Sequence, residues 1–318
     1  MQLHGLHHVT AVTGDAPANL AFYTGVLGLR LVKKTVNQDD VSAYHLFYAD
    51  KLGSPGTDMT FFDWPRTGPD RRGTDSITAT HFRVNGDAAL EYWVARLGEA
   101  GVSHGPIETL SGRATLRFED PEGQRLALVD DGGESFHGEV WTGSGVPSTF
   151  ALRGFHAVTL NVPRLDRVEP IFTDLLGFTA TDRRPNPDNP VEELTVYTMN
   201  GGGPGREVHV IAQPNAPRAW LGHGGVHHVA FRLRDDAEQQ AWQSRLNEVG
   251  LPNSGIIDRF YFKSLYFRIS NGILFELATD GPGFGADEDI DRLGERLALP
   301  PFLEGRRATI EAGLRPLD

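Results

Sequence analysis

A pair of neighbouring histidines occurs twice in this chain, each time at the start of a strand-like run. His7 and His8 lie in LHHVTAV near the N-terminus, and His227 and His228 lie in VHHVAFRL. Glu276 stands between apolar residues in the strand-like stretch NGILFELA. A carboxylate on an apolar strand is costly to bury unless a cation pairs with it. Imidazole and carboxylate are also common metal ligands. The question is therefore which fold could bring these side chains together.

The segments that carry these residues belong to a unit of roughly 70 residues that occurs four times. Each copy has an alternating strand, an amphipathic helix that ends at a glycine, and three further strand-like runs. The first strand and the helix of the four copies occupy residues 6–32, 77–103, 155–181 and 227–253. Such an open sheet cannot bury its concave face alone. The sequence predicts an α+β fold in which four βαβββ modules pair into two cup-shaped half-barrels.

The module boundaries fall in stretches rich in Gly, Pro and Ser, such as TGSGVPS. We expect an N-terminal domain with modules 1 and 2 at residues 1–148 and a C-terminal domain with modules 3 and 4 at residues 149–285. Residues 286–318 are expected to form a C-terminal helical extension, whose acidic stretch ADEDIDRLGER is a solvated helix start.

Alignment of the modules predicts a metal site. His8 and His228 occupy the same position on the first strands of modules 1 and 4, and Glu276 lies on the last strand of module 4. The aligned positions in the other modules hold mostly alanine: Ala79, Ala127 and Ala157. Two imidazoles and one carboxylate form the facial triad of non-haem Fe(II) oxygenases. We therefore predict these three residues as metal ligands and expect modules 1 and 4 to share a cup. The second cup would be a structural or vestigial partner.

Either histidine of each pair could face inward, so His7 and His227 are alternative ligands. The strand-to-helix turns align better with His8 and His228. His7 and His227 then point to the other side of the strand or lie at its mouth, where they could handle protons. His156 aligns with His7 but belongs to the cup without ligands. No role is predicted for five other histidines: His81, His104, His137, His209 and His223.

Composition narrows the partners. The net charge is −12 without long basic runs, so neither nucleic acid nor an anionic membrane is an expected partner. No apolar stretch reaches 18 residues, and the N-terminus begins with a strand pattern, which predicts neither a membrane span nor a signal peptide. The chain has no cysteine, so a metal site must use nitrogen and oxygen ligands. We expect a cytoplasmic protein that could form a homo-oligomer.

Several segments carry a resemblance to a known family: HHVTAVTGD, LAFYTGVLGLRLV, YHLFYADKLGSPGTDMTFFDWP, DRFYFKSLYFRISNGILFELATDGPGF and LPPFLEGRRATIEAGL. They make the chain similar to the vicinal oxygen chelate superfamily, which includes glyoxalase I, bleomycin-resistance proteins and extradiol dioxygenases. More narrowly, the whole chain resembles the hydroquinone-type ring-cleaving dioxygenases, which are four-module proteins that act on (chloro)hydroquinones and related phenols. It departs from catechol-type enzymes, whose ligands come from modules 3 and 4, because Ala157 holds the module 3 position.

The resemblance implies the vicinal oxygen chelate fold and Fe(II), with Mn(II) as a substitute, at His8, His228 and Glu276. It implies a small aromatic substrate and O2 as partners. It also implies a set of residues around the metal that act on the substrate: His7, Thr10, His227, Arg259 and Tyr266.

In such an enzyme a phenol would bind the metal through its oxygen while O2 takes a neighbouring position. His7, His227 or Tyr266 would then exchange protons. Arg259 would stabilise the phenolate. By strand position, three phenylalanines are expected to line the ring pocket: Phe61, Phe231 and Phe275.

Two alternatives remain open. A glyoxalase-type isomerase would need a fourth protein ligand, which Thr60 of module 1 does not supply unless the register shifts and Asp58 faces inward. A non-catalytic binding or resistance protein would use the cup without metal, and such a protein has no need of Glu276.

Overall fold

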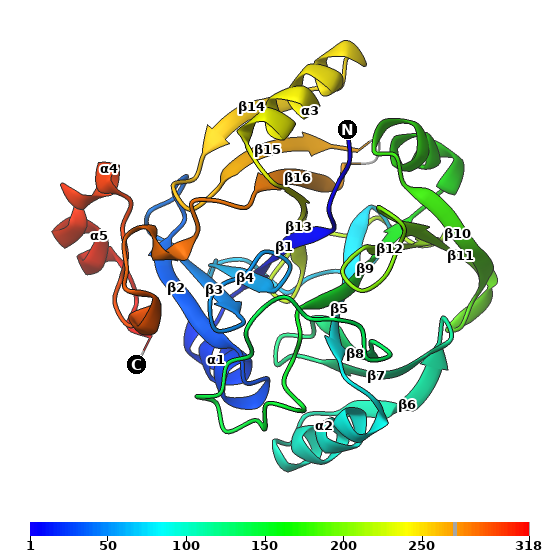
Figure 1. The fold of residues 1–318 in the computed structure, drawn as a ribbon, viewed down its shortest axis with the longest axis horizontal. Helices are drawn as coiled ribbons and strands as arrows, with labels where there is room; N and C mark the ends of the chain where they lie inside the picture. Colours follow the sequence, from blue (N-terminus) through cyan, green and yellow to red (C-terminus); the bar gives the residue numbers. More distant parts are fainter. Residues whose placement is uncertain (270–271, 318) are drawn as a thin grey trace.

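The computed structural model describes residues 1–269 and 272–317. Figure 1 follows the chain through four modules of a strand, a helical segment and three strands. Module 1 has β1 (Leu6–Thr13), α1 (Ala16–Leu20), a π-helical turn (Ala21–Val26), β2 (Arg30–Val36), β3 (Tyr44–Ala49) and β4 (Asp58–Asp63). Module 2 has β5 (Ser76–Val84), α2 (Asp87–Glu99), β6 (His104–Leu110), β7 (Arg113–Glu119) and β8 (Arg125–Asp130). Module 3 has β9 (Phe155–Val162), two short turns, β10 (Thr179–Asn186), β11 (Asn189–Thr198) and β12 (Glu207–Ala212). Module 4 has β13 (Val226–Leu233), α3 (Asp236–Glu248), β14 (Asn253–Asp258), β15 (Lys263–Arg268) and β16 (Leu274–Thr279).

Module 3 departs from the predicted pattern in its helix. A 3-10 turn at Leu165–Arg167 and a π-helical turn at Ile171–Leu175 replace the single amphipathic helix that the sequence predicts. Pro170 lies between the two turns. Because proline has no N–H and its ring clashes with the preceding turn, an uninterrupted α-helix is unfavourable there.

Two antiparallel strand pairs determine which modules share a cup. β1 pairs with β13, and β5 pairs with β9. Modules 1 and 4 therefore form one cup, here named the first cup, and modules 2 and 3 form the second cup. Val226 of β13 also pairs with Ile77 of β5, so the described strands belong to one 16-stranded sheet rather than to a closed barrel. The sequence correctly predicts this pairing, whereas the domain division at residue 148 stays a prediction.

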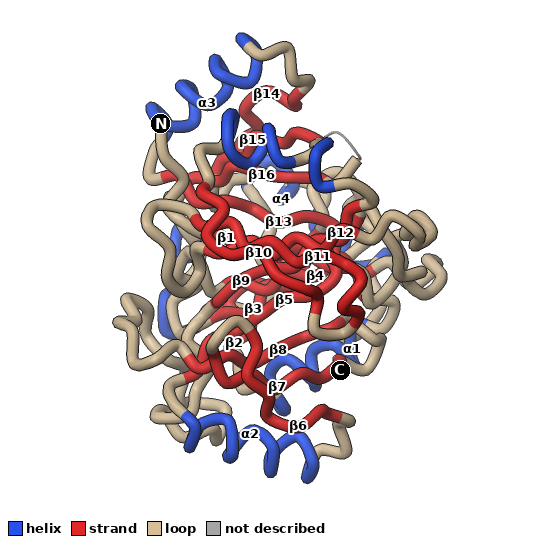
Figure 2. The backbone as a smooth tube through the Cα atoms, turned by 90° about the vertical axis from the view of Figure 1, so that its right-hand side faces the viewer, coloured by secondary structure: helices blue, strands red, loops and turns tan. Residues whose placement is uncertain are grey.

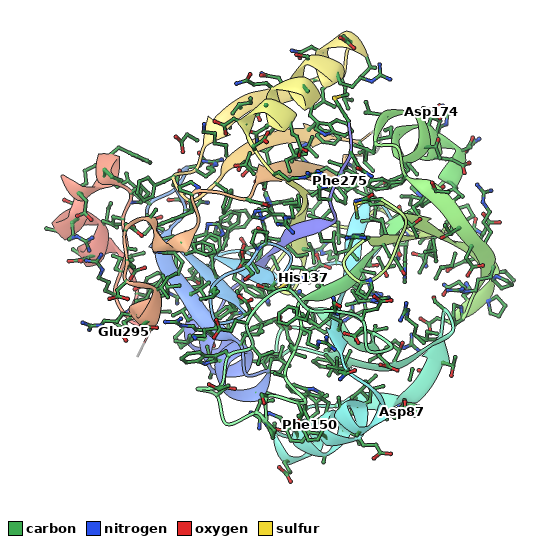
Figure 3. All side chains as sticks on the ribbon, in the orientation of Figure 1. Asp87, His137, Phe150, Asp174, Phe275 and Glu295 are labelled. Carbon is green, nitrogen blue, oxygen red and sulfur yellow. The ribbon has the colours of Figure 1, made fainter. Side chains whose placement is uncertain are left out.

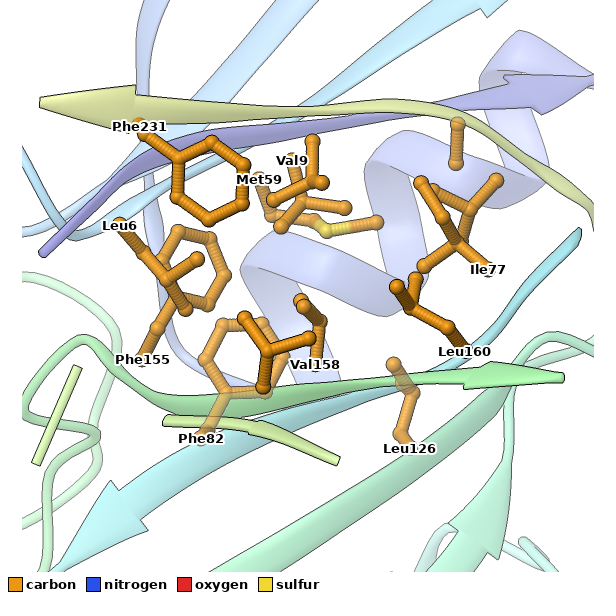
Figure 4. Close-up of a cluster of buried hydrophobic side chains, with 14 of the residues drawn as sticks. Leu6, Val9, Met59, Ile77, Phe82, Leu126, Phe155, Val158, Leu160 and Phe231 are labelled. Atoms are coloured by element: carbon orange, nitrogen blue, oxygen red, sulfur yellow. The ribbon is translucent and has the colours of Figure 1, made fainter. Parts of the chain in front are cut away.

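The main hydrophobic core lies between the two strand pairs. In Figure 4, Val9 and Phe231 of the β1–β13 pair face Phe82 and Phe155 of the β5–β9 pair. Neighbouring residues of a strand point to opposite faces of the sheet. The core position of Val9 therefore places its neighbour His8 inside the first cup. Helices α2 and α3 lie at opposite ends of the molecule (Figure 2), and each contributes buried side chains to the same hydrophobic cluster.

The segment after β16 packs against β2 through a buried lysine. Lys33 of β2 is 0% exposed and donates to the carbonyl oxygen of Phe284 at 3.0 Å. It also forms ion pairs with Asp287, at 2.7 Å, and with Glu288. A buried lysine needs such acidic partners. The acidic stretch is therefore an ordered anchor with two 3-10 turns instead of a solvated helix start.

Two short helices follow this anchor, α4 (Pro301–Glu304) and α5 (Arg307–Gly313). No helix in the described part of the chain is long and apolar enough to cross a bilayer.

Candidate metal centre

Three buried side chains of the first cup converge. His8 of β1, His228 of β13 and Glu276 of β16 place one ligand atom each within 4.8 Å of one another. Glu276 Oε2 lies 3.2 Å from His8 Nε2 and 2.9 Å from His228 Nε2. Ligand atoms about 2.1 Å from one metal ion, at right angles to each other, lie about 3 Å apart. The structure thus brings together the three residues predicted as ligands, and the two distances to Glu276 match those expected between ligand atoms of one metal ion.

The carboxylate of Glu276 supports a cation at this point. Glu276 is 0% exposed, and neither carboxylate oxygen has a hydrogen-bond partner among the described residues. The two imidazole nitrogens approach it closely but without the directions of a hydrogen bond. Burial disfavours the charged form of Glu276 and raises its pKa, whereas positive charge at the neighbouring His8 and His228 positions lowers this pKa, and the balance lies well below the usual value. A buried, ionised carboxylate without hydrogen bonds requires a positive partner.

A β-bulge beside each ligand explains why the histidines come in pairs. On β1, Leu6 pairs with Phe231 and His8 pairs with Ala230, which leaves His7 as the extra residue. The second bulge lies on β13. Thr10 of β1 pairs with His228 and Ala11 pairs with Val226, which leaves His227 without a partner residue on β1. In a regular strand, His7 and His227 would point to the face opposite their ligand neighbours. A β-bulge changes the direction of the extra side chain.

Because of the bulges, each extra histidine lies beside its ligand neighbour. His7 Nδ1 is 2.9 Å from His8 Nδ1, and His227 Nδ1 is 2.8 Å from His228 Nδ1. His7 is buried in the cup rather than on the other side of the strand, and His227 is partly buried against Phe62.

The contacts of His7 assign the tautomer of His8. His7 Nε2 lies 3.1 Å from the carbonyl oxygen of Thr279, and a carbonyl only accepts, so this nitrogen carries a proton. Burial, followed by the nearby His8, lowers the pKa of His7 to about 3, so its ring is neutral at pH 7. Its Nδ1 then accepts a hydrogen bond from His8 Nδ1–H. The proton of His8 is therefore held at Nδ1, and the lone pair of Nε2 faces Glu276, as metal binding requires.

A second chain of polar contacts runs along the floor of the cup. Thr10 Oγ1 lies 2.8 Å from Thr60 Oγ1, which lies 3.0 Å from His45 Nε2. Burial, followed by the nearby His8 and His228, lowers the pKa of His45 well below its usual value. The sequence prediction missed His45. The available signal was the alternation in YHLFYA, which puts His45 and Phe47 on the same face of β3.

Tyr266 and Arg259 stand at one side of the triad. Tyr266 of β15 pairs with Glu276 in the strand register, and its ring centre lies 5.7 Å from that of His228. The Arg259 guanidinium lies 5.5 Å from the centre of the Tyr266 ring, and Asp39 accepts two hydrogen bonds from it at 2.9 and 3.1 Å. Burial and the charge of Glu276 raise the pKa of Tyr266, so its hydroxyl stays protonated at neutral pH.

Comparison with known proteins gives the family. The family model described as "Glyoxalase/Bleomycin resistance protein/Dioxygenase superfamily" matches residues 5–128 and 154–277. The chain belongs to this superfamily. It is 48% identical to "Putative ring-cleaving dioxygenase MhqA" of Bacillus subtilis, over 100% of both chains. It is 32% identical to "Chlorohydroquinone/hydroquinone 1,2-dioxygenase" of Sphingobium indicum, over 96% of this chain and 94% of the relative. The crystal structure of a "putative dioxygenase" from Bacillus subtilis has a TM-score of 0.91 at 35% identity, and the match covers 100% of this chain and 98% of that one.

Within this superfamily fold, the aromatic lining of the first cup differs from the predicted one. The three phenylalanines predicted to line it lie in the main hydrophobic core, where Figure 4 shows Phe231: Phe61, Phe231 and Phe275. Each is the neighbour along the strand of a cup-facing residue, so the alternation of side chains directs it into the core. Other aromatic side chains lie against the site histidines, with ring centres 5.1 Å (Phe262 to His8), 5.5 Å (Phe62 to His227) and 4.0 Å (Phe47 to His45) apart.

The fourth ligand of a glyoxalase-type isomerase is not found among the described residues. Thr60 bridges Thr10 and His45, and Asp58 lies outside the group of converging ligand atoms. Burial raises the pKa of Asp58 well above its usual value, which favours the neutral acid.

The histidines without a predicted role lie elsewhere. His137 is exposed on the loop between β8 and β9 (Figure 3), and His104 begins β6. His223 lies 3.3 Å from Glu122. The other three belong to the second cup: His81, His156 and His209.

Proposed function

We propose that this protein is an Fe(II)-dependent, extradiol-type ring-cleaving dioxygenase that acts on hydroquinone-like phenols. The observation that carries the proposal is the buried group of His8, His228 and Glu276, which has the donor set of non-haem Fe(II) oxygenases. The names of the two curated relatives support ring cleavage, and one of them names hydroquinones.

The metal would be held by two imidazole nitrogens and one carboxylate oxygen, a donor set that suits Fe(II) and also accepts Mn(II). Bound Fe(II) would supply open coordination positions and would allow electrons to pass from a phenol to O2. The remaining steps depend on protons, because ring opening by O2 adds both oxygen atoms and keeps every hydrogen of the phenol.

His227 is the group best placed to move these protons. Since metal binding through His228 Nε2 leaves the proton of His228 on Nδ1, His227 Nδ1 accepts from it at 2.8 Å. Burial, followed by the neighbouring His228, lowers the pKa of His227 to about 3, so its ring is neutral and its own proton is on Nε2. His227 is partly buried beside Phe62 and Trp64, which would let the ring of a phenol stack nearby.

Tyr266 and Arg259 would position the substrate. The raised pKa of Tyr266 keeps a hydrogen-bond donor at the edge of the triad. Arg259, held by Asp39, adds a fixed positive charge that favours the phenolate over the phenol. His7 would not touch the substrate, because Thr279 and His8 occupy both of its nitrogens.

Oxygen consumption by anaerobically Fe(II)-loaded protein tests the proposal. The substrates are hydroquinone, methylhydroquinone, a chlorohydroquinone and catechol, each corrected for uptake without protein. We expect uptake with the hydroquinones. It should be lost in His8→Ala, His228→Ala and Glu276→Ala and retained in His137→Ala, which removes an exposed imidazole. Uptake that persists in the three ligand variants, or uptake with no phenol, would contradict the proposal.

A further inference from the structure

The second cup encloses a cavity of about 790 Å³. It lies between β5–β8 and β9–β12, which Figure 1 shows on the side of the molecule away from β14–β16. Ala79, Ala127 and Ala157 stand where the first cup has its predicted metal ligands. These alanines remove the side chains that could hold a metal in the equivalent way, yet the cavity is large enough for a small organic molecule.

Two histidines of the cavity wall contact Glu207, which does not itself line the cavity, and four other carboxylates do line it: Glu108, Glu119, Asp188 and Glu192. Glu207 Oε2 of β12 lies 3.0 Å from His209 Nε2 and 3.5 Å from His156 Nε2. His81 Nε2 lies 3.0 Å from Thr159 Oγ1. Burial lowers the pKa of both His81 and His156, which leaves these rings neutral. The carboxylate of Glu207 therefore has its hydrogen-bond partners within the wall, and this histidine cluster does not balance a positive charge elsewhere in the cavity.

Arg125 is a cation of this wall that lacks a partner. It lines the cavity from β8, two residues before Ala127 and so on the same face of the strand. Its guanidinium forms no hydrogen bond and no ion pair within the described residues. The acids around it have other partners: Glu119 pairs with Arg72 at 2.7 Å, Asp188 pairs with Arg117 at 2.7 Å, and Asp70 accepts from the backbone N–H of Gly222 at 3.4 Å. Burial lowers the pKa of Arg125. Partly buried, unpaired positive charge is unfavourable without an anion to complete it.

One part of the cavity wall is suited to an apolar body, although much of the remaining wall is polar. Its wall includes small and aliphatic side chains: Ala79, Ala127, Val129, Leu194 and Ile211. A carboxylate matches the planar guanidinium of arginine with two parallel hydrogen bonds. We propose that the second cup binds a small organic acid, with its carboxylate on Arg125 and a ring-sized apolar body against the aliphatic wall. This site is separate from the candidate metal centre and does not depend on the proposed reaction.

Benzoate is the probe, titrated by calorimetry into the full-length protein without added metal. We expect saturable binding at millimolar or lower concentration. Benzamide has the same shape without the charge and should bind at least about tenfold more weakly, since charge-assisted hydrogen bonds are the stronger ones. Arg125→Met should weaken benzoate binding by a similar factor. Arg164→Met, which removes an exposed guanidinium paired with Asp166, should leave benzoate binding unchanged.

Two further variants locate benzoate binding in the second cup. Ala127→Leu adds apolar volume to the cavity without changing charge and should also weaken benzoate binding, which keeps the test valid if Arg125→Met fails to fold. His228→Ala, which alters the first cup, should leave benzoate binding unchanged. No saturable binding of benzoate, equal binding by wild type and Arg125→Met, or binding that His228→Ala removes would each overturn the proposal.

Discussion

Replacement of His7 by phenylalanine tests how the candidate metal centre is organised. His7 touches neither the predicted metal position nor, in our proposal, the substrate. It accepts a hydrogen bond from His8 Nδ1 and donates one to the carbonyl oxygen of Thr279. Phenylalanine keeps a ring against Phe262, whose centre lies 5.3 Å away, and removes both nitrogens. His8 would then lose the partner that holds its proton on Nδ1.

The expected effect is on metal affinity. Loss of a partner that orients a metal-binding histidine lowers affinity about 10- to 100-fold, or about 1.4 to 2.8 kcal/mol. His7→Asn should recover part of this loss, because its side-chain oxygen can take the place of Nδ1 as the acceptor. The pair of variants therefore separates the hydrogen bond from the loss of the ring.

The assay is an anaerobic titration of metal-free protein with Fe(II), and in parallel with Mn(II), against a competing chelator. His137→Phe is the matched control, because His137 is exposed and does not belong to the group of converging ligand atoms. If His7→Phe binds metal as tightly as the wild type, or if His7→Asn is no better than His7→Phe, the assigned chain of hydrogen bonds is wrong.

Three further predictions concern stability and the lining of the first cup. Among the described residues, Lys33→Met leaves the buried Glu288 with only a longer ion pair to Arg296, at 3.6 Å, and should lower the free energy of unfolding by about 3 kcal/mol in urea denaturation; unchanged stability would show that the anchor is dispensable. Burial raises the pKa of Asp120 from 3.8 to about 6, so the folded state binds this proton more tightly, and the resulting stability is full below pH 3.8 and is lost as the pH rises through about 6. Between about pH 3 and pH 7, the wild type should therefore lose about 3 kcal/mol of unfolding free energy relative to Asp120→Asn. If the difference between the two proteins stays constant over this range, the pKa of Asp120 is not raised. Phe61→Ala should lower the free energy of unfolding by about 3–5 kcal/mol with little change in the KM for a hydroquinone. Phe62→Ala should raise that KM and lower stability less. If Phe61→Ala instead raises the KM and Phe62→Ala does not, Phe61 lines the cup as the sequence predicted.

The internal repeat explains why the three candidate ligands could be found from sequence. Aligned modules share one fold, so a histidine or glutamate that replaces an alanine at the same position is visible without a structure. His8, His228 and Glu276 were identified in this way, and the pairing of modules 1 and 4 followed from them. The metal itself, a cytoplasmic location and a homo-oligomeric state stay predictions.

Other features depend on contacts between strands and were not predictable in the same way. A bulge arises from one extra residue relative to the partner strand, so the placement of His7 beside His8 was not visible in β1 alone. Phe231 is a different case, because it lies three residues after His228 and alternation along β13 alone places it on the opposite face, in the core; its predicted place in the cup was wrong. The anchoring of the C-terminal segment depends on Lys33, which is more than 250 residues away in the chain.

Mass spectrometry of the product formed from hydroquinone under ¹⁸O₂ tests the central claim most directly. It also separates ring cleavage from simple oxidation, because oxidation of hydroquinone to a quinone consumes O2 without incorporating it. We predict that the Fe(II)-loaded protein yields a ring-opened acid that carries both labelled oxygen atoms, and that Glu276→Ala yields none. A quinone without label, or a labelled product that forms equally with Glu276→Ala, would contradict the account.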